Sequence, residues 1–380
     1  MIAIHDPHIP GLADLCPETL RRITGADDVA LLRLRYRAGK RAILHLSTDL
    51  GEGAVWFSQG DKASSLAKRN KTTSSFDPAS KALFEAFPND HRLPQIRTFV
   101  EGFETIGPAL IGGTPKGPPV LLRYRPGLSC TFRCEVSEGA PVFVKLTDDD
   151  RQMRTAELNR QMACHLADGP AGIAPVIGTA PKFRAVAYAA APGRSLEACL
   201  VETGNFGAVA QAIDALGQFW AMPLTPERHL SVDALVARAA DAVLLISATV
   251  PEAAAPVEDR LARIRRQRPR LALRPIHADI KLEHLFIDAR RTTLIDTESV
   301  SLGPSDYDLA QLFGRLLQAE LDGTIPRPIV ERATATVVSA AGSTFEWCLS
   351  IVALRLAKFH AQRPAPDAAC KIRAILERLS

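Results

Sequence analysis

The residues best suited to chemistry lie between positions 277 and 298. His277, Asp279 and His284 fall in the segment IHADIKLEHLFID (276–288), and Asp296 follows an apolar pair shortly after it. An aspartate on a loop can orient an attacking hydroxyl and accept its proton, while a second aspartate after a strand holds Mg²⁺ on nucleotide phosphates. An unpaired carboxylate behind apolar residues is costly to bury, which favours a functional role for Asp296 over a plain loop position. The pattern therefore predicts a phosphoryl-transfer site.

The elements that must position these residues change character along the chain. Three short β-like runs separated by turns, VLLRYR (120–125), CTFRCEV (130–136) and PVFVKL (141–146), predict consecutive antiparallel strands. Helical spacing follows at about 151–166, and long alanine-rich stretches with helical periodicity begin near residue 205. We therefore expect a small β-rich unit followed by a larger helical unit that carries the catalytic loop.

The order of these motifs resembles that of the aminoglycoside phosphotransferase and choline kinase superfamily, small-molecule kinases with a protein-kinase-like fold. The resemblance covers about residues 118–320 and is carried by IHADIKLEHLFID followed by LIDTESVSLGPSDYDLAQL. It implies that Asp279 is the catalytic aspartate and Asp296 the metal-binding aspartate, and that Asp306 and Asp308 open the next helix. The implied fold class is α+β, a two-lobed kinase-like fold with a small antiparallel N-lobe and a larger, mostly helical C-lobe.

The resemblance also implies a nucleotide-binding set upstream. Lys145 resembles the strand lysine that grips nucleotide phosphates, and Glu157 resembles its helix partner, with the two acids just before that helix as competing partners. Ser129, in a turn between strands, would offer its hydroxyl and backbone N–H groups to the phosphates. The adenine would meet backbone groups near Ala187 and Ala189.

Two residues depart from the superfamily pattern. Ala278 replaces the usual glycine, which we expect to require only a negative φ. His284 replaces the usual asparagine, and an imidazole is a poorer ligand for Mg²⁺ than an oxygen. His284 either binds metal weakly, or donates to phosphate, or marks the loss of the second metal position, and Glu298 could supply the missing oxygen. We expect His277 to support the catalytic loop through hydrogen bonds, and Asp308 to cap the next helix and tie down the loop.

The length divides into three parts. We expect an N-terminal extension over 1–115, a nucleotide-binding N-lobe over 116–191 and a helical C-lobe over 192–380. Arg35-Tyr36-Arg37-Ala38-Gly39 echoes Arg123-Tyr124-Arg125-Pro126-Gly127, and each is followed by a β-like run and an E-G-A turn. The first copy has no counterpart of the strand lysine. The extension is therefore either a degenerate strand–turn–strand repeat of the N-lobe or an unrelated segment with similar strands.

Composition and charge exclude several classes of protein. The 380 residues include 46 basic and 42 acidic side chains, a net charge of +4 that is too balanced for binding nucleic acid or an anionic membrane by charge alone. The seven cysteines are scattered without a C-x-x-C motif, which suits a reducing compartment. Neither a leader nor a membrane-spanning run is evident, so we expect a cytoplasmic protein.

The sequence thus predicts an ATP- or GTP-dependent kinase that needs Mg²⁺ and phosphorylates a hydroxyl of a small molecule. Residues 321–380 hold eight basic against five acidic side chains, which favours a neutral or anionic acceptor. The arginine-rich run at 259–274 is either a solvated helix face or an anion-attracting rim. Two alternatives stay open, a catalytically weak pseudokinase that serves as an interaction module and a zinc hydrolase using His277, Asp279 and His284. The oligomeric state is left undetermined.

Overall fold

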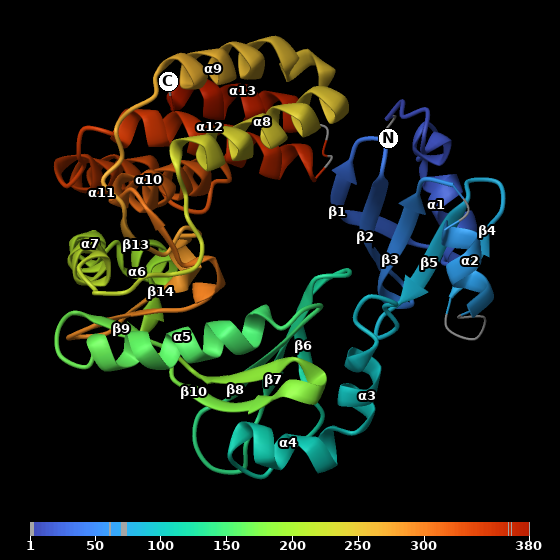
Figure 1. The fold of residues 1–380 in the computed structure, drawn as a ribbon, viewed down its shortest axis with the longest axis horizontal. Helices are drawn as coiled ribbons and strands as arrows, with labels where there is room; N and C mark the ends of the chain where they lie inside the picture. The colour runs from blue at the N-terminus through green and yellow to red at the C-terminus, as the bar shows by residue number, and fades with distance from the viewer. Residues whose placement is uncertain (1–3, 61, 70–73, 364, 366, 380) are drawn as a thin grey trace.

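The computed structural model describes residues 4–60, 62–69, 74–363, 365 and 367–379. Figure 1 shows three bodies in chain order: an N-terminal sheet (blue), a second sheet with its helices (green), and a helical body (yellow to red). No helix of these described residues is long and apolar enough to cross a membrane.

The second sheet is the predicted N-lobe. It is fully antiparallel, with the strand order β10-β11-β8-β7-β6. Its elements are β6 (Val120–Arg125), β7 (Ser129–Cys134), β8 (Val142–Thr147), α5 (Arg151–His165), β10 (Val176–Ala180) and β11 (Ala185–Ala189). The three strands predicted from alternating residues are present within two residues at each end, because their turns carry glycine where the backbone must reverse.

Two helices before this sheet belong to it. α3 (Gln95–Glu101) and α4 (Phe103–Ile111) bury apolar side chains, including Phe99 and Phe103, against Phe132 of the sheet. A domain boundary at residue 115, as expected from the sequence, would therefore separate α3 and α4 from the N-lobe core on which they pack. The glycine- and proline-rich stretch there only links α4 to β6, and the change from one apolar core to the next falls shortly after β5, near residue 87.

The N-terminal sheet has the same topology as the N-lobe sheet. Its order is β1-β2-β3-β5-β4, and all its pairings are antiparallel. Its elements are α1 (Pro17–Thr24), β1 (Val29–Arg37), β2 (Arg41–Thr48), β3 (Gly51–Ser58), α2 (Lys62–Arg69), β4 (Ser75–Asp77) and β5 (Ala82–Ala86). In both sheets the third strand leads into a helix, and the last strand inserts between the third and the fourth.

The two R-Y-R-x-G segments fold into equivalent hairpins. Each ends a first strand and continues through a turn glycine with positive φ, 64° at Gly39 and 62° at Gly127. In each hairpin the tyrosine hydroxyl and the glycine N–H donate to one buried aspartate that precedes the sheet. These sets are Tyr36 and Gly39 on Asp6, and Tyr124 and Gly127 on Asp90.

Strand register identifies the residue that replaces Lys145 in the first sheet. The hairpins close with the pairs Arg37–Arg41 and Arg125–Ser129. Two residues after Arg41, Ile43 pairs with Trp56 of β3, and two residues after Ser129, Thr131 pairs with Lys145 of β8. Trp56 is buried with Ile43, Ala63 and Leu83. The face that carries an amine in the N-lobe is therefore a buried apolar cluster in the N-terminal sheet.

The C-lobe consists mainly of helices. They are α6 (Leu196–Thr203), α7 (Gly207–Trp220), α8 (Val232–Thr249), α9 (Ala254–Arg266), α10 (Ser305–Leu321), α11 (Arg327–Ser339), α12 (Phe345–Ala361) and α13 (Ala368–Arg378). Two small sheets face the N-lobe, with the orders β12-β14-β15-β9 and β13-β16. Their strands are β9 (Ala171–Ile173), β12 (Arg194–Ser195), β13 (Arg274–Ile276), β14 (Leu285–Ile287), β15 (Thr292–Leu294) and β16 (Ser301–Gly303). These strands frame the catalytic loop.

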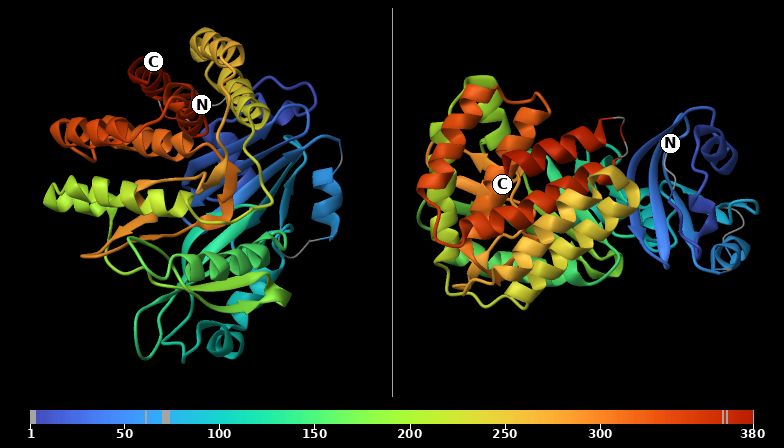
Figure 2. Two further views of the ribbon diagram at one scale, coloured as in Figure 1. Left: turned by 60° about the vertical axis from the view of Figure 1, so that its left-hand side comes forward. Right: turned by 90° about the horizontal axis from the view of Figure 1, so that it is seen from above.

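The N-terminal sheet contacts both lobes. In β1 the Leu34 N–H donates to the carbonyl of Gln362, just after α12, at 2.7 Å. The neighbouring Arg35 donates to the carbonyl of Pro126, in the β6–β7 turn of the N-lobe, at 2.6 Å. The views in Figure 2 show the blue sheet beside the end of the red helices as well as beside the N-lobe. This sheet therefore closes the ring of three bodies.

Candidate active site

The catalytic loop runs from β13 to β14 and is held by α10. The backbone N–H groups of His277 and Ala278 donate to the carboxylate of Asp308 at 2.9 and 2.8 Å, and Trp220 donates to the same group at 3.0 Å. Gln311 accepts from Ile280 N–H and donates to the Ala278 carbonyl. Asp308 thus ties down the loop as predicted, from inside the first turn of α10 and not from its cap position.

Ala278 has a φ of 63°, in the left-handed region. The expectation of a negative φ at this position was wrong, because the loop must reverse sharply to present two successive N–H groups to one carboxylate. A non-glycine residue in this conformation costs about 1–2 kcal/mol. The hydrogen bonds to Asp308 offset that cost, since bonds to a charged group contribute about 1.5–3 kcal/mol each.

Asp279, the predicted catalytic residue, points into a basic environment. Lys281 Nζ lies 3.8 Å from its Oδ2 and Arg355 Nη2 lies 3.7 Å from its Oδ1. Burial alone would raise the pKa of Asp279, but the charges of Lys281 and Arg355 outweigh it and lower the pKa to about 2. Asp279 is therefore an ionised carboxylate that can accept a hydrogen bond from a hydroxyl and orient it.

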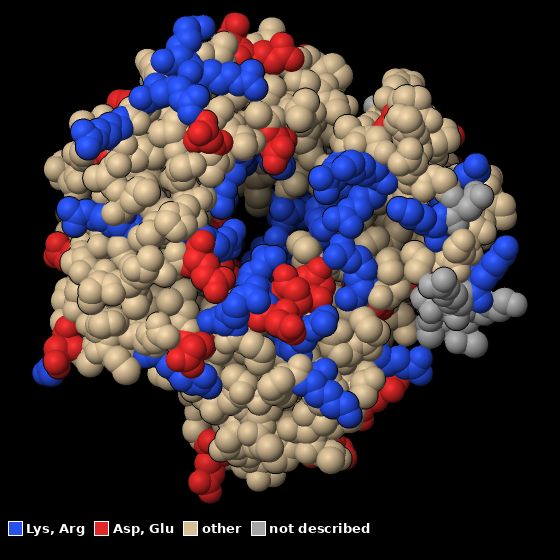
Figure 3. Space-filling model, viewed as in Figure 1, with Lys and Arg blue, Asp and Glu red and all other residues tan. Residues whose placement is uncertain are grey.

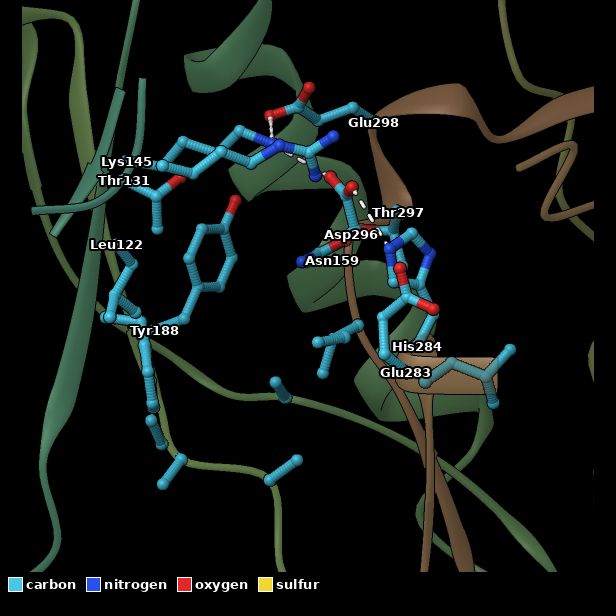
Figure 4. A pocket seen from close by; sticks show the side chains of 18 of the residues that line it. Leu122, Thr131, Lys145, Asn159, Tyr188, Glu283, His284, Asp296, Thr297 and Glu298 are labelled. Carbon is cyan, nitrogen blue, oxygen red and sulfur yellow. Dashed lines mark hydrogen bonds and ion pairs between the residues drawn. The ribbon is translucent and has the colours of Figure 1, made fainter. Parts of the chain in front are cut away.

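Asp296 and Lys145 form the centre of the site. Lys145 Nζ lies 2.8 Å from Asp296 Oδ1 and 2.6 Å from Glu298 Oε1, and Figure 4 shows the amine between the two carboxylates. Burial opposes the charge of each group, yet the pairing raises the pKa of Lys145 and holds the pKa of Asp296 well below its ordinary value. The structure thus brings together the lysine and the aspartate that the sequence placed 151 residues apart.

Glu157 does not pair with Lys145. Its side chain is 62% exposed on α5 and contacts Arg160 and Gln161 on the same helix. The predicted Lys145–Glu157 pair is therefore wrong. The side of α5 that faces the cleft carries the buried amides Gln152 and Asn159 instead, and Glu298 supplies the second carboxylate to Lys145.

His284 is buried between the two aspartates. Its Nδ1 contacts the Asp279 carbonyl at 3.0 Å, and its Nε2 lies 3.3 Å from Lys281 Nζ and 3.5 Å from Asp296 Oδ2. Burial, with the charge of Lys281, lowers its pKa to about 4, so the ring is neutral near pH 7. With the proton on Nδ1, the Nε2 atom presents a lone pair and does not donate to phosphate.

The donor set fits a divalent cation such as Mg²⁺. Ligand atoms of Asp279, His284 and Asp296 lie within 4.8 Å of one another, and two of the three groups are the carboxylates that hard cations prefer. Among the described residues Glu298 is not part of this cluster. His277 is also outside it, because its ring contacts the Ile295 carbonyl, so the zinc alternative loses one of its three ligands.

A cavity of 420 Å³ extends from Lys145 between the lobes. Ser129 lines it, as predicted, together with Tyr188 and Ala189. Ala187 does not line it, because its side chain lies in the N-lobe core and its backbone is paired on both sides within the sheet. The apolar side chains of the cavity are Leu122, Phe143, Ala174, Ala190, Ala191, Phe286, Leu294 and Ile295. The part of the cavity lined by these apolar side chains suits the base of a nucleotide, and the part near Lys145 suits its phosphates.

A second cavity, of 790 Å³, adjoins the first and contains Asp279 in its lining. Asp296 and Glu298 line both cavities, whereas Asp279 lines only the second. Figure 3 shows lysine and arginine side chains (blue) around the hollow between the three bodies. The carboxylates of the site therefore stand where a nucleotide in the first cavity would meet an acceptor in the second.

Sequence reasoning missed several residues of this site. Lys281 stands two positions after Asp279, so its proximity was readable from the motif. Arg355 comes from the middle of α12, where no local pattern distinguishes it. The amide of Asn159 on α5 accepts a hydrogen bond from Thr297, beside Asp296, and only the packing of α5 shows this contact.

Comparisons with known proteins agree with this geometry. The family model described as the phosphotransferase enzyme family matches residues 123–341, more than half of the chain. No curated protein sequence matches the chain.

Solved structures share the fold. A thermostable variant of aminoglycoside phosphotransferase APH(4)-Ia, in ternary complex with AMP-PNP and hygromycin B, is 15% identical, with a TM-score of 0.55 over 73% of this chain and 97% of that one. An amicoumacin kinase in complex with AMP-PNP and Ca²⁺ is 10% identical, with a TM-score of 0.51 over 76% and 95%. The predicted protein-kinase-like α+β fold is therefore confirmed.

Proposed function

The chain belongs to the phosphotransferase enzyme family and is a phosphotransferase that acts on an alcohol group, and we propose that ATP or GTP is its phosphate donor. Mg²⁺ is the proposed cofactor, and the molecule that carries the alcohol group is small and neutral or anionic. The observation that carries this proposal is the position of the carboxylates. Asp296 and Glu298 border both cavities, and Asp279 faces only the second.

In the proposed reaction the acceptor hydroxyl attacks the γ-phosphorus of the nucleotide. A new O–P bond forms, the bond from the γ-phosphorus to the β–γ bridging oxygen breaks, and the nucleoside diphosphate leaves. Asp279 orients the hydroxyl and takes its proton. Because the pKa of Asp279 is about 2, orientation is its main contribution, and the proton moves late, as a loose phosphoryl-transfer transition state allows.

Asp296 would hold Mg²⁺, with His284 as a poorer additional ligand and Asp279 nearby. Bound there, the ion would neutralise charge on the nucleotide phosphates. The amine of Lys145 lies between Asp296 and Glu298. Glu298 holds this amine in position, the role that the sequence assigned to Glu157. Ser129 and Ala189 then lie along the walls where the phosphates and the base would sit.

The test is a phosphotransfer screen over hydroxylated small molecules with ATP and GTP, followed by two variants. Asp279→Asn is expected to lower kcat about 10²–10⁴-fold with nearly unchanged nucleotide affinity, since a positioned base contributes that range. Asp296→Asn is expected to weaken Mg·nucleotide binding itself. Asp214→Asn, at an exposed position on α7, is the matched control and should change neither quantity.

The pseudokinase alternative predicts a different result. Calorimetry would then detect Mg·ATP binding that Asp296→Asn abolishes, with no turnover on any acceptor and no effect of Asp279→Asn. Near-wild-type turnover by Asp279→Asn on a good acceptor would refute the role given to that residue.

A further inference from the structure

The second cavity is strongly basic for a site that faces a catalytic carboxylate. Nine arginines and two lysines line it, against seven acidic residues, and three of those acids are the carboxylates Asp279, Asp296 and Glu298. None of the arginines in the run at 259–274 contributes, because that run lies on α9 and the segment after it. Apart from Arg123, Arg125 and Lys281, the positive charge of the cavity therefore comes from residues outside the motifs identified in the sequence.

Seven of the nine arginines have no carboxylate partner. Within the part of the chain that the structure describes, no carboxylate oxygen lies within 4.0 Å of their guanidinium groups. They are Arg33, Arg123, Arg125, Arg228, Arg238, Arg315 and Arg363. Five of the seven are half-buried, whereas Arg123 and Arg228 are exposed. Half-buried charges gathered around one cavity are usually paired, so this cluster carries an excess of positive charge.

Neutral groups hold three of these arginines in place. Arg33 donates to the side-chain carbonyl of Gln362 at 2.7 Å, and Arg315 donates to that of Gln318 at 2.7 Å. The guanidinium carbons of Arg315 and Arg363 lie 5.7 and 3.6 Å from the centre of the Phe359 ring. Aromatic and amide contacts of this kind fix a guanidinium without neutralising it, so N–H donors stay available to a ligand.

The arginines also repel one another. Burial, and then the charges of Arg125 and Arg363, lower the pKa of Arg33 to about 9. Burial, and then Arg123 and Arg315, lower the pKa of Arg363 to about 10. Arg33 Nε is in addition a buried donor that has no hydrogen-bond partner among the described residues. An anion placed among these arginines would reduce the repulsion between their charges and accept hydrogen bonds from their free N–H groups.

The nucleotide does not account for all of this charge. Arg123 and Arg125 line both cavities and can serve nucleotide phosphates, but Arg33, Arg315 and Arg363 line only the second. These three come from different bodies or elements: β1 of the N-terminal sheet, α10, and the segment after α12. They converge on the space that Asp279 faces.

Resting on the proposed kinase function, we propose that the acceptor is a small hydroxylated molecule that already carries a phosphate group, bound by Arg33, Arg315 and Arg363 while its free hydroxyl meets Asp279. A phosphate dianion offers three oxygens to guanidinium donors that approach from several sides, whereas a carboxylate offers two. A polycationic acceptor would be repelled by the same residues. The N-terminal sheet thus takes part in acceptor recognition through Arg33.

The first test compares matched acceptors that differ by one phosphate: glucose with glucose 6-phosphate, ribose with ribose 5-phosphate, and glycerol with glycerol 3-phosphate. The phosphorylated member of at least one pair is expected to have the higher kcat/KM. Arg315→Gln and Arg363→Gln should each lower kcat/KM for that member about 10–100-fold, the loss expected for one charge-assisted hydrogen bond, with little effect on its partner. Arg265→Gln, an exposed arginine on α9, is the control.

The second test is independent of turnover. Calorimetry measures binding of inorganic phosphate to the full chain with saturating Mg·AMP-PNP, which fills the first cavity. Wild type and Arg265→Gln should bind phosphate, whereas the double variant Arg315→Gln/Arg363→Gln should not, and Arg315→Lys/Arg363→Lys should keep part of the affinity. Circular dichroism confirms folding of each variant.

The outcomes separate this inference from the proposed function. Phosphate binding that depends on the arginines, without phosphotransfer to any acceptor, would support the anion site and refute the kinase. Faster transfer to unphosphorylated, carboxylated or cationic acceptors, with no effect of the arginine variants, would refute the phosphate site and leave the kinase intact.

Discussion

Replacing Asp90 with asparagine is expected to weaken nucleotide binding, because this carboxylate holds the hairpin turn beside the nucleotide cavity. Asp90 is 3% exposed and accepts three hydrogen bonds, from the Tyr124 hydroxyl at 2.9 Å, Gly127 N–H at 2.6 Å and Arg92 N–H at 2.9 Å. The strands on either side of this turn carry Arg125 and Ser129 into the cavity. Loss of order in the turn therefore reaches groups that would contact phosphate.

The magnitude follows from the hydrogen bonds. Asparagine can keep one oxygen on the Tyr124 and Gly127 donors, but its amide NH₂ then faces Arg92 N–H, another donor. One bond to a charged group is lost, about 1.5–3 kcal/mol, so the free energy of unfolding should fall by about 2 kcal/mol. If all of that energy comes from the order of the turn, nucleotide affinity falls at most about 30-fold, since about 1.4 kcal/mol corresponds to a factor of ten.

The chain contains its own matched control for this change. Asp6 accepts the same three bonds in the N-terminal sheet, from the Tyr36 hydroxyl and Gly39 N–H at 2.7 Å each and from His8 N–H at 2.9 Å. Asp6→Asn should lower stability by a similar amount without weakening nucleotide binding. The measurements are denaturant unfolding and calorimetric titration with Mg·AMP-PNP. Equal nucleotide affinity in the two variants, at comparable losses of stability, would refute the link between the turn and the phosphates.

Further substitutions test other parts of the site. Glu298→Gln should weaken nucleotide binding by about tenfold, because it removes one carboxylate from Lys145. Glu157→Gln should leave nucleotide affinity unchanged, and calorimetry measures both. A loss of affinity in Glu157→Gln but not in Glu298→Gln would instead support the Lys145–Glu157 pair. His284→Asn should lower the KM for Mg²⁺ in steady-state assays, because an amide oxygen is the better ligand, and a raised KM would contradict this. Ala278→Gly should raise the free energy of unfolding by up to about 1 kcal/mol in denaturant titrations, and a loss would show that the left-handed conformation is not strained.

The sequence predicted the elements whose signals are local. The N-lobe hairpin could be found because its strands alternate and its turns carry glycine, and the catalytic loop because Asp279 and Asp296 stand at fixed places around short strands. The order of motifs in a resembling family predicted that Lys145 and Asp296 serve one nucleotide site, but not that they form an ion pair. The confirmed fold and enzyme class rest on that order more than on any single residue.

The errors arise where tertiary packing decides which groups of a predicted element face the site. Glu157 lies at a plausible distance along the chain from Lys145, but the rotation of α5 turns it to solvent and turns Gln152 and Asn159 inward. The backbone of Ala187 was expected to meet the adenine, but it is paired with a strand on each side within the sheet. A one-residue change in the helical phase of α5 would reverse the first outcome, and the sequence alone does not determine that phase.

The contacts of β1 with both lobes bear on how the enzyme turns over. Leu34 and Arg35, adjacent in sequence, are bonded to the C-lobe and to the N-lobe hairpin turn respectively. Kinase-like lobes joined only by a linker lose freedom of relative movement each time they close on substrates. Here folding of the chain already restrains that movement, so both cavities are preorganised. Substrate exchange is then expected through the open faces of the ring, at a rate set by the affinity of each product and not by a hinge.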